Sequence, residues 1–219
     1  MSAVPRQQEV LEELRRRIRG IERRPVRRPG LLPSGRPEVD ARLPGGGFPC
    51  GALVDLAGGP ASGKTLVALS TLREAQRGRG LAAFVDGRDE LYPPAARALG
   101  IELPRLLIVR PGPSGGRRDE GAGGEALPGL WAAEVLLGSG AFAAVAVDVS
   151  LRGVPAARAE AMLRRLRAAA EKGGAVALWI GLPGGPGIPA ALRLDLGGPG
   201  RDPAVHASRG GAREDGHAA

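Results

Sequence analysis

Residues 52–69 read ALVDLAGGPASGKTLVAL, and this stretch decides the fold. A short apolar run, Leu53, Val54 and Leu56, comes before a glycine-rich loop, and apolar residues continue at helical spacing after it. The loop satisfies the phosphate-loop pattern G-x-x-x-x-G-K-[ST]. Its residues are Gly58, Gly59, Pro60, Ala61, Ser62, Gly63, Lys64 and Thr65. Because the pattern stands between a strand and a helix, it predicts a phosphate-loop fold.

Each part of this loop has a chemical role. Glycines let the backbone turn its N–H groups toward an anion at the start of a helix. Lys64 is predicted to reach the β- and γ-phosphates of ATP, and the Thr65 hydroxyl to hold Mg²⁺. The magnesium site also needs an acid at the end of a neighbouring apolar strand. Asp148 follows such a run and is the candidate, although an aspartate can also simply end a strand.

The rest of the chain alternates between apolar strands and helices. Strands are expected at residues 81–86, 106–109, 142–149, 175–181 and 191–196, and helices at residues 64–77, 93–99, 125–137 and 155–171. Strand runs that are apolar throughout are typical of parallel sheets covered on both faces. The pattern predicts an α/β fold with a mostly parallel, doubly wound sheet.

Charge and composition divide the chain into four parts. Residues 1–24 are predicted to form an arginine-rich amphipathic helix, because Val10, Leu11, Leu14, Ile18 and Ile21 make an apolar stripe at helical spacing. Residues 1–30 hold nine arginines against four glutamates. Residues 25–36 are a Pro/Gly linker, residues 37–196 the α/β core, and residues 197–219 a tail too polar to order. The basic helix could dock on its own domain, on a partner or on DNA.

Composition also limits the location of the protein. No apolar run approaches the roughly 20 residues that cross a membrane, and the charged N-terminus lacks the apolar region of a signal peptide. The single cysteine, Cys50, excludes an internal disulfide framework. These features predict a cytoplasmic protein, with association with the nucleoid left open.

Hydrolysis of ATP needs a group that orients or deprotonates the attacking water. The segment after the second strand offers Asp89 or Glu90, but both suit a solvated loop equally well. Arg88, between them and the strand, is cationic at any relevant pH. No base is therefore assigned from the residues alone.

At this point the chain resembles the RecA recombinase core over residues 32–196. The segments that carry the resemblance are residues 34–40 and 46–51, the phosphate loop, and residues 84–86, 96–100, 124–127, 145–148 and 192–196. The resemblance implies a RecA-like P-loop NTPase core. It also implies that Lys64 and Thr65 bind phosphate and Mg²⁺, with Asp148 as the Walker B acid.

The departures from the RecA pattern concern turnover and DNA. The catalytic glutamate of that family falls on Arg88, its adenine-stacking tyrosine on Ala95, and its γ-phosphate-sensing glutamine at or near Leu182. Its two DNA-binding loops are shortened to residues 151–155 and 183–188. Compared with the RecA pattern, the chain therefore has the phosphate-binding loop but lacks the residues for ATP hydrolysis and the full DNA-binding loops.

This combination, with the arginine-rich helix, is similar to the ImuA family. That similarity implies an accessory protein of SOS mutagenesis and translesion synthesis, with RecA, ImuB and an error-prone polymerase as partners. ATP would then be bound without efficient hydrolysis. The main alternative is a DNA-dependent ATPase of the recombinase type; a SulA-like cell-division inhibitor is a remote one. A small kinase or transferase would need a substrate pocket that nothing in the sequence marks.

Overall fold

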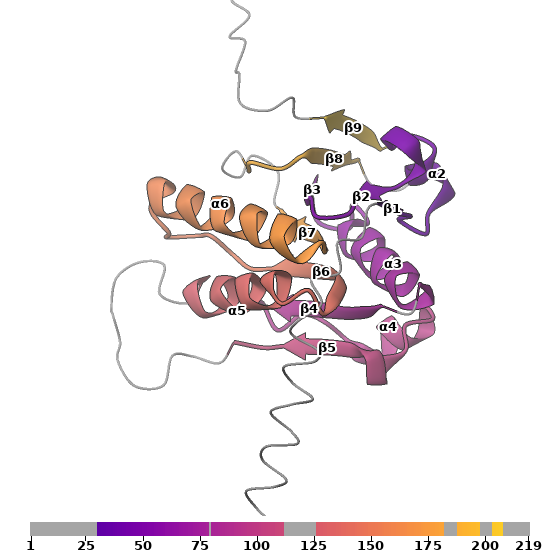
Figure 1. The fold of residues 1–219 in the computed structure, drawn as a ribbon, viewed down its shortest axis with the longest axis horizontal. Helices are drawn as coiled ribbons and strands as arrows, with labels where there is room; N and C mark the ends of the chain where they lie inside the picture. Colours follow the sequence, from indigo (N-terminus) through magenta and orange to yellow (C-terminus); the bar gives the residue numbers. More distant parts are fainter. Residues whose placement is uncertain (1–29, 79, 112–125, 182–187, 198–202, 208–219) are drawn as a thin grey trace, which may run out of the picture.

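The computed structural model describes residues 30–78, 80–111, 126–181, 188–197 and 203–207. These residues form a seven-stranded sheet in the order β5-β4-β6-β7-β3-β8-β9, with helices on both faces (Figure 1). Its neighbouring strands run parallel, except that β9 is antiparallel to β8. The predicted mostly parallel α/β sheet is confirmed. The strands are β3 Leu53–Gly58, β4 Leu81–Asp86, β5 Leu106–Val109, β6 Phe142–Asp148, β7 Val176–Ile180, β8 Leu192–Leu196 and β9 Ala204–Ala207.

Two apolar cores lie on the two faces of this sheet. Helix α3 (Lys64–Arg77) and α4 (Pro93–Ala98) cover one face, where Leu72 packs with buried residues of the strands. Helices α5 (Ala126–Gly138) and α6 (Ala156–Gly173) lie side by side on the other face, where Leu163 packs. Because successive side chains of a strand point to opposite faces, both cores draw on the same strands. This double burial explains why the strands read as continuous apolar runs.

The described residues that precede β3, residues 30–52, form a segment along α3, here called the strap. Strand β1 (Leu31–Leu32) pairs antiparallel with β2 (Phe48–Pro49). The other elements are α2 (Pro37–Asp40) and two 3-10 turns, η1 (Pro44–Gly46) and, farther along, η2 (Leu103–Arg105). Strand β1 lies within the predicted linker, residues 25–36, and the pairing with β2 orders these two residues.

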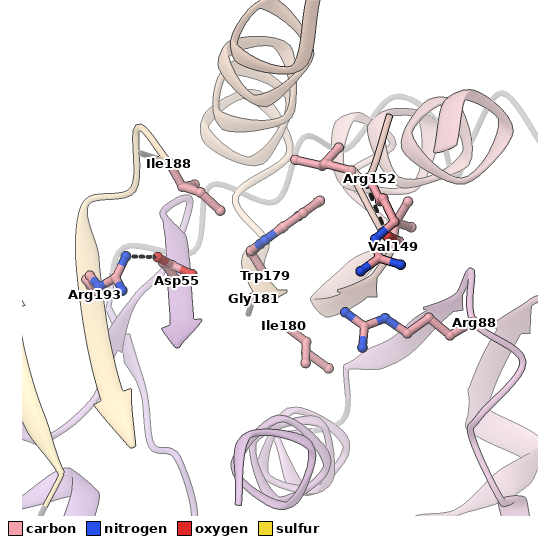
Figure 2. A pocket seen from close by; sticks show the side chains of 11 residues that line it. Asp55, Arg88, Val149, Arg152, Trp179, Ile180, Gly181, Ile188 and Arg193 are labelled. Carbon is pink, nitrogen blue, oxygen red and sulfur yellow. Dashed lines mark hydrogen bonds and ion pairs between the residues drawn. The ribbon is translucent and has the colours of Figure 1, made fainter. Parts of the chain in front are cut away.

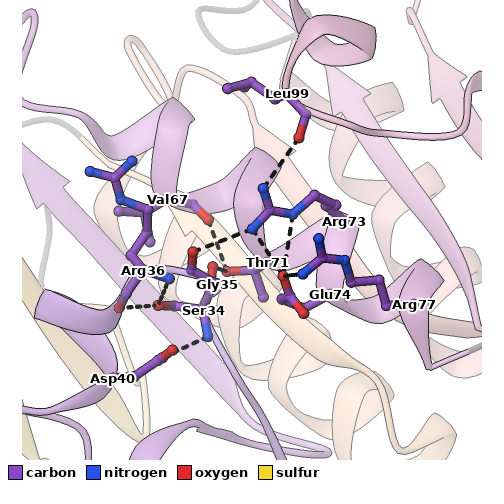
Figure 3. Close-up of polar contacts among 10 residues, drawn as sticks. All are labelled: Ser34, Gly35, Arg36, Asp40, Val67, Thr71, Arg73, Glu74, Arg77 and Leu99. Carbon is purple, nitrogen blue, oxygen red and sulfur yellow. Dashed lines mark hydrogen bonds and ion pairs between the residues drawn. The ribbon is translucent and has the colours of Figure 1, made fainter.

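Polar contacts hold the strap to the helix (Figure 3). Within the strap the Ser34 amide donates to Asp40 Oδ1 at 2.7 Å, and within α3 Thr71 Oγ1 donates to the Val67 carbonyl at 2.8 Å. Between the two, Thr71 Oγ1 lies 3.5 Å from the Ser34 carbonyl oxygen. Arg73 donates to the carbonyls of Gly35 and Leu99, both at 3.3 Å. Ser34 and Thr71 are both fully buried, so these bonds satisfy polar groups that have no access to water. The strap thereby stabilises the helix that begins at the phosphate loop.

The C-terminal end of the described chain also differs from expectation. Strand β9 lies in the region predicted to be disordered, so that prediction is wrong for Ala204–Ala207. The predicted N-terminal helix, residues 1–24, lies outside the described residues. Within the part of the chain that the structure describes, no helix is long and apolar enough to span a membrane.

Candidate nucleotide-binding site

The phosphate loop connects the end of β3 to the start of α3. Its shape depends on two glycines. Gly63 caps the helix with φ +91°, a left-handed conformation that glycine adopts without strain. A Cβ at Gly58 would collide with Ser62 Oγ and lie 2.6 Å from the Leu196 carbonyl oxygen. The glycines at these positions are therefore required by the backbone path, as the motif predicted.

The side chain of Lys64 connects the two ends of the phosphate loop. Its Nζ donates to the Gly58 carbonyl at 2.6 Å, and the residue is only 9% exposed. Burial, followed by the positive charge of Arg88, lowers the pKa of Lys64. An anion at this position would relieve that penalty. A cavity of about 560 Å³ opens here, lined by residues 59–66 together with Arg88, Glu90, Asp148 and Ile180.

Asp148 ends β6 and faces this cavity from the neighbouring strand. Its side chain is 7% exposed, and burial raises the pKa of its carboxyl group. Arg88 opposes that shift, because its Nε lies 3.0 Å from Asp148 Oδ1. The two atoms form an ion pair, but their alignment is not that of a hydrogen bond. The carboxylate is therefore neutralised by charge and still has an acceptor atom to offer.

The backbone after β4 places Arg88 beside this acid. Strands β4 and β6 pair in parallel with Asp86 opposite Asp148, and the Gly87 amide donates to the Asp148 carbonyl at 2.9 Å. The Asp86 carboxylate then accepts hydrogen bonds from the amides of Glu90 and Leu91. These contacts fix the turn between them, and Arg88 extends sideways to the neighbouring strand.

Four buried side-chain atoms in the described residues have no hydrogen-bond partner. They are Asp55 Oδ1, Ser62 Oγ, Arg88 Nε and Asp148 Oδ1. Buried polar atoms are ordinarily paired, and an unpaired one costs free energy. Ser62 and Asp148 both line the phosphate-loop cavity, so a phosphate and its Mg²⁺ would satisfy them. The residues present fit a magnesium nucleotide.

The structure brings together most of the predicted site. The phosphate loop from Gly59 to Thr65 and Asp148 line one cavity. Of the two acids considered for hydrolysis, Glu90 lines the cavity, whereas Asp89 pairs with Arg110 at 2.8 Å and is 75% exposed. Leu182 and residues 183–187 lie outside the described residues. Among the described ones, no three His, Cys, Asp or Glu side chains gather to hold a metal, so Mg²⁺ would need phosphate oxygens as ligands.

Sequence reasoning missed two features of the site. The resemblance put Arg88 at the position of the catalytic glutamate, but the ion pair between Arg88 and Asp148 was not predicted. It also missed Ile180, which ends β7 and contributes an apolar wall to the cavity. The strand run itself was visible in the sequence, but its place beside β3 follows from the sheet order.

Comparison with known proteins agrees with this geometry. The family model described as the RecA N-terminal domain matches residues 23–171, more than half of the chain. The chain belongs to the RecA N-terminal domain family. Three RecA proteins are similar to it: 37% identical over 137 residues in Salinispora tropica, 38% over 126 in Enterococcus gallinarum, and 41% over 117 in Corynebacterium jeikeium.

The match to these RecA proteins is partial. It covers 63%, 58% and 53% of this chain, in the same order, and 36%, 33% and 28% of the relatives. The chain thus spans about a third of the length of the curated relatives it matches. Membership of the RecA N-terminal domain family accounts for the α/β core and its nucleotide-binding fold.

Proposed function

We propose that this chain is a RecA-fold accessory protein of DNA damage tolerance that binds ATP with Mg²⁺ and hydrolyses it poorly. The observation that carries the proposal is the ion pair between Arg88 and Asp148 at 3.0 Å. By resemblance, Arg88 stands where RecA proteins hold the glutamate that activates water. A guanidinium cannot accept a proton at any relevant pH. Arg88 would therefore supply no base for the attacking water, and Glu90 is the described acid besides Asp148 that lines the cavity.

The proposed ATP binding rests on charged and polar groups at the cavity, some of which have no partner in the protein. Lys64 and the loop amides would hold the phosphates, and Thr65 and Asp148 would hold Mg²⁺. Ser62 Oγ and Asp148 Oδ1 have no hydrogen-bond partner among the described residues. Bound ATP would supply charge stabilisation at Lys64 and would stabilise the folded chain by mass action.

The proposed accessory role follows from the similarity to the ImuA family. In this proposal RecA, ImuB and an error-prone polymerase are the partners, and SOS translesion synthesis in the cytoplasm is the process. The arginine-rich residues 1–24 are the proposed contact to a partner or to DNA, because they combine a basic face with an apolar stripe. Family membership and the RecA relatives support the RecA-like part of this proposal.

A DNA-dependent ATPase of the recombinase type is the second candidate. The complete phosphate loop and Asp148, gathered at one cavity, favour it. The two candidates differ in turnover. An ATPase of this type hydrolyses ATP faster when single-stranded DNA is bound, and its DNA binding weakens steeply with salt.

The experiment measures ATP binding by calorimetry and ATP hydrolysis with and without single-stranded DNA. The accessory function predicts saturable binding and no DNA-stimulated turnover. Turnover that DNA stimulates would overturn it in favour of the ATPase. In a second arm, purified RecA is tested for binding to the full chain and to a chain lacking residues 1–30. Loss of RecA binding on truncation supports the proposed contact, and equal binding by both chains removes it.

A further inference from the structure

A second cavity of about 510 Å³ lies beside the phosphate loop on the α5 and α6 face of the sheet (Figure 2). It shares Arg88 and Ile180 with the nucleotide site and is otherwise lined by other residues. Its volume falls in the range of roughly 300–1,000 Å³ that small-molecule sites occupy. Nothing in the proposed function uses this cavity.

One end of the cavity carries a buried carboxylate. Asp55 sits in the middle of β3, its side chain is 4% exposed, and its Oδ2 accepts from Arg193 Nη1 at 3.0 Å. Its other oxygen, Oδ1, is buried without a hydrogen-bond partner. Arg193 also binds Asp195 through Nε at 3.1 Å, so its charge is shared between two carboxylates. At this end of the cavity, Asp55 Oδ1 could therefore accept a hydrogen bond from a ligand.

Arginines stand at the opposite end, and an indole ring lies between the two ends (Figure 2). The exposed guanidinium of Arg152 makes no hydrogen bond or ion pair with another described residue, whereas its amide donates to Ser150 Oγ at 3.3 Å. Arg88 lies nearby, paired with Asp148. The middle of the cavity is lined by Trp179 and the apolar residues Val149, Leu151, Ile180 and Ile188. A flat ring can stack on or against an indole, and guanidinium groups bind phosphate. The cavity thus combines a donor-seeking end, an aromatic middle and an anion-seeking end.

Gly181 leaves the space that such a ring would need. A Cβ at this position would lie 2.9 Å from Asp55 Oδ1 and 3.4 Å from the Trp179 ring. A side chain here would fill the gap between the carboxylate and the indole. Because Gly181 has no side chain, no Cβ stands between Asp55 Oδ1 and the Trp179 ring, and both residues line the cavity.

We infer that this cavity is a second ligand site for a nucleoside monophosphate, distinct from the ATP site. The base donates an N–H to Asp55 and lies against Trp179, while the phosphate binds Arg152 and Arg88. The innermost residues, Asp55 and Trp179, are almost fully buried. This burial favours a free nucleotide over a nucleotide within a DNA or RNA chain. The inference does not depend on the partners named in the proposed function.

Trp179 provides the measurement. The chain has two tryptophans, and the other, Trp131, is 64% exposed on α5 away from the cavity. In the variant Trp131→Phe, fluorescence reports on Trp179 alone. Lys64→Ala is added to remove binding at the phosphate loop. Each of the four nucleoside monophosphates is titrated into this double variant, and inorganic phosphate and a short single strand are titrated separately.

We expect a saturable change in Trp179 fluorescence with at least one monophosphate. Adding Arg152→Ala should weaken binding by about tenfold, the loss of one charged hydrogen bond. Adding Gly181→Ala should also weaken binding, because its Cβ would stand 2.9 Å from Asp55 Oδ1 and fill the space of the ring. The matched controls Gly138→Ala and Arg158→Ala lie on α5 and α6 outside the cavity and should leave affinity unchanged. Arg152 is at the surface, so its variant keeps the test valid if Gly181→Ala does not fold.

Several results would overturn the inference. No saturable change with any monophosphate removes the site. An equal response to inorganic phosphate shows an anion site that does not read a base. Undiminished binding in both cavity variants places the ligand elsewhere. A response to the single strand without one to any monophosphate assigns the cavity to nucleic acid instead of a free ligand.

Discussion

The guanidinium of Arg88 lies 3.0 Å from Asp148 Oδ1, at an edge of the sheet where β4 and β6 end side by side. By the resemblance to RecA, this pair joins the position expected for a catalytic glutamate to the acid expected to hold Mg²⁺. It leaves Asp148 neutralised but without a hydrogen bond. The cavity at the phosphate loop thus keeps an acceptor atom for an additional ligand, and a guanidinium stands beside it.

Lys64 is expected to provide most of the affinity for phosphate. Replacing it by alanine removes a charged donor, which is worth about 1.5–3 kcal/mol, so ATP binding should weaken by roughly 10- to 100-fold. Calorimetric titration of ATP with Mg²⁺ measures this. The matched control is Lys172→Ala, because Lys172 is the other lysine of the chain and lies exposed in the last turn of α6. Equal affinity in Lys64→Ala and the unmodified chain would contradict the site.

The charge of Asp148 should make the nucleotide-free protein less stable as pH rises. Burial raises the pKa of Asp148 above its usual 3.8, so the folded state holds that proton more tightly than the unfolded state. Its stabilising effect is therefore present below pH 3.8 and is lost as pH rises through the raised pKa. The melting temperature of the unmodified chain minus that of Asp148→Asn should fall across this window and then stay constant. A difference that grows with pH would contradict the burial.

Asp86 should stabilise the turn that carries Arg88. Its side chain is fully buried and accepts from the Glu90 amide at 3.0 Å and from Arg110 Nε at 3.0 Å. Asp86→Ala should lower the free energy of unfolding by about 1–3 kcal/mol, because buried donors lose their acceptor. Asp89→Ala removes the exposed partner of the same Arg110 and should cost less than about 1 kcal/mol. Urea denaturation measures both, and equal losses would contradict the role of Asp86.

Gly173 allows α6 to approach the end of α5. A Cβ at Gly173 would collide with the Leu137 carbonyl oxygen, which is backbone and cannot move aside. Gly173→Ala should therefore destabilise the fold by about 1–3 kcal/mol. At Gly138, on the facing helix, a Cβ would lie 3.9 Å from the Ala169 Cβ, an ordinary contact. Gly138→Ala should be neutral or stabilising, and a larger loss at Gly138 than at Gly173 would refute this packing.

The strands from β4 to β8 and helix α3 could be predicted from the sequence because their signals are local. β4 and β5 are apolar runs bounded by turns, and α3 begins at Lys64 and ends at Arg77, as its spacing predicted. β1 and β9 could not be predicted. Each is short, and each forms only by pairing with another strand, Phe48–Pro49 for β1 and Leu192–Leu196 for β9. Pairing of this kind depends on the register of the whole sheet.

The candidate site was predictable to the same extent. The phosphate loop is a local motif, and Asp148 follows from one strand end. The Arg88 and Asp148 contact depends on β4 lying next to β6 in register, which no local pattern encodes. The same holds for Asp55, whose partner Arg193 comes from another strand, 138 residues farther along the chain.

The most direct test is single-turnover ATP hydrolysis by the unmodified chain, Arg88→Gln and Arg88→Glu, with single-stranded DNA present. We predict no DNA-stimulated turnover in the unmodified chain or in Arg88→Gln. Arg88→Glu should hydrolyse ATP at least about tenfold faster than the unmodified chain, because a carboxylate then stands where a general base acts. Turnover by the unmodified chain that equals or exceeds that of Arg88→Glu would contradict the account.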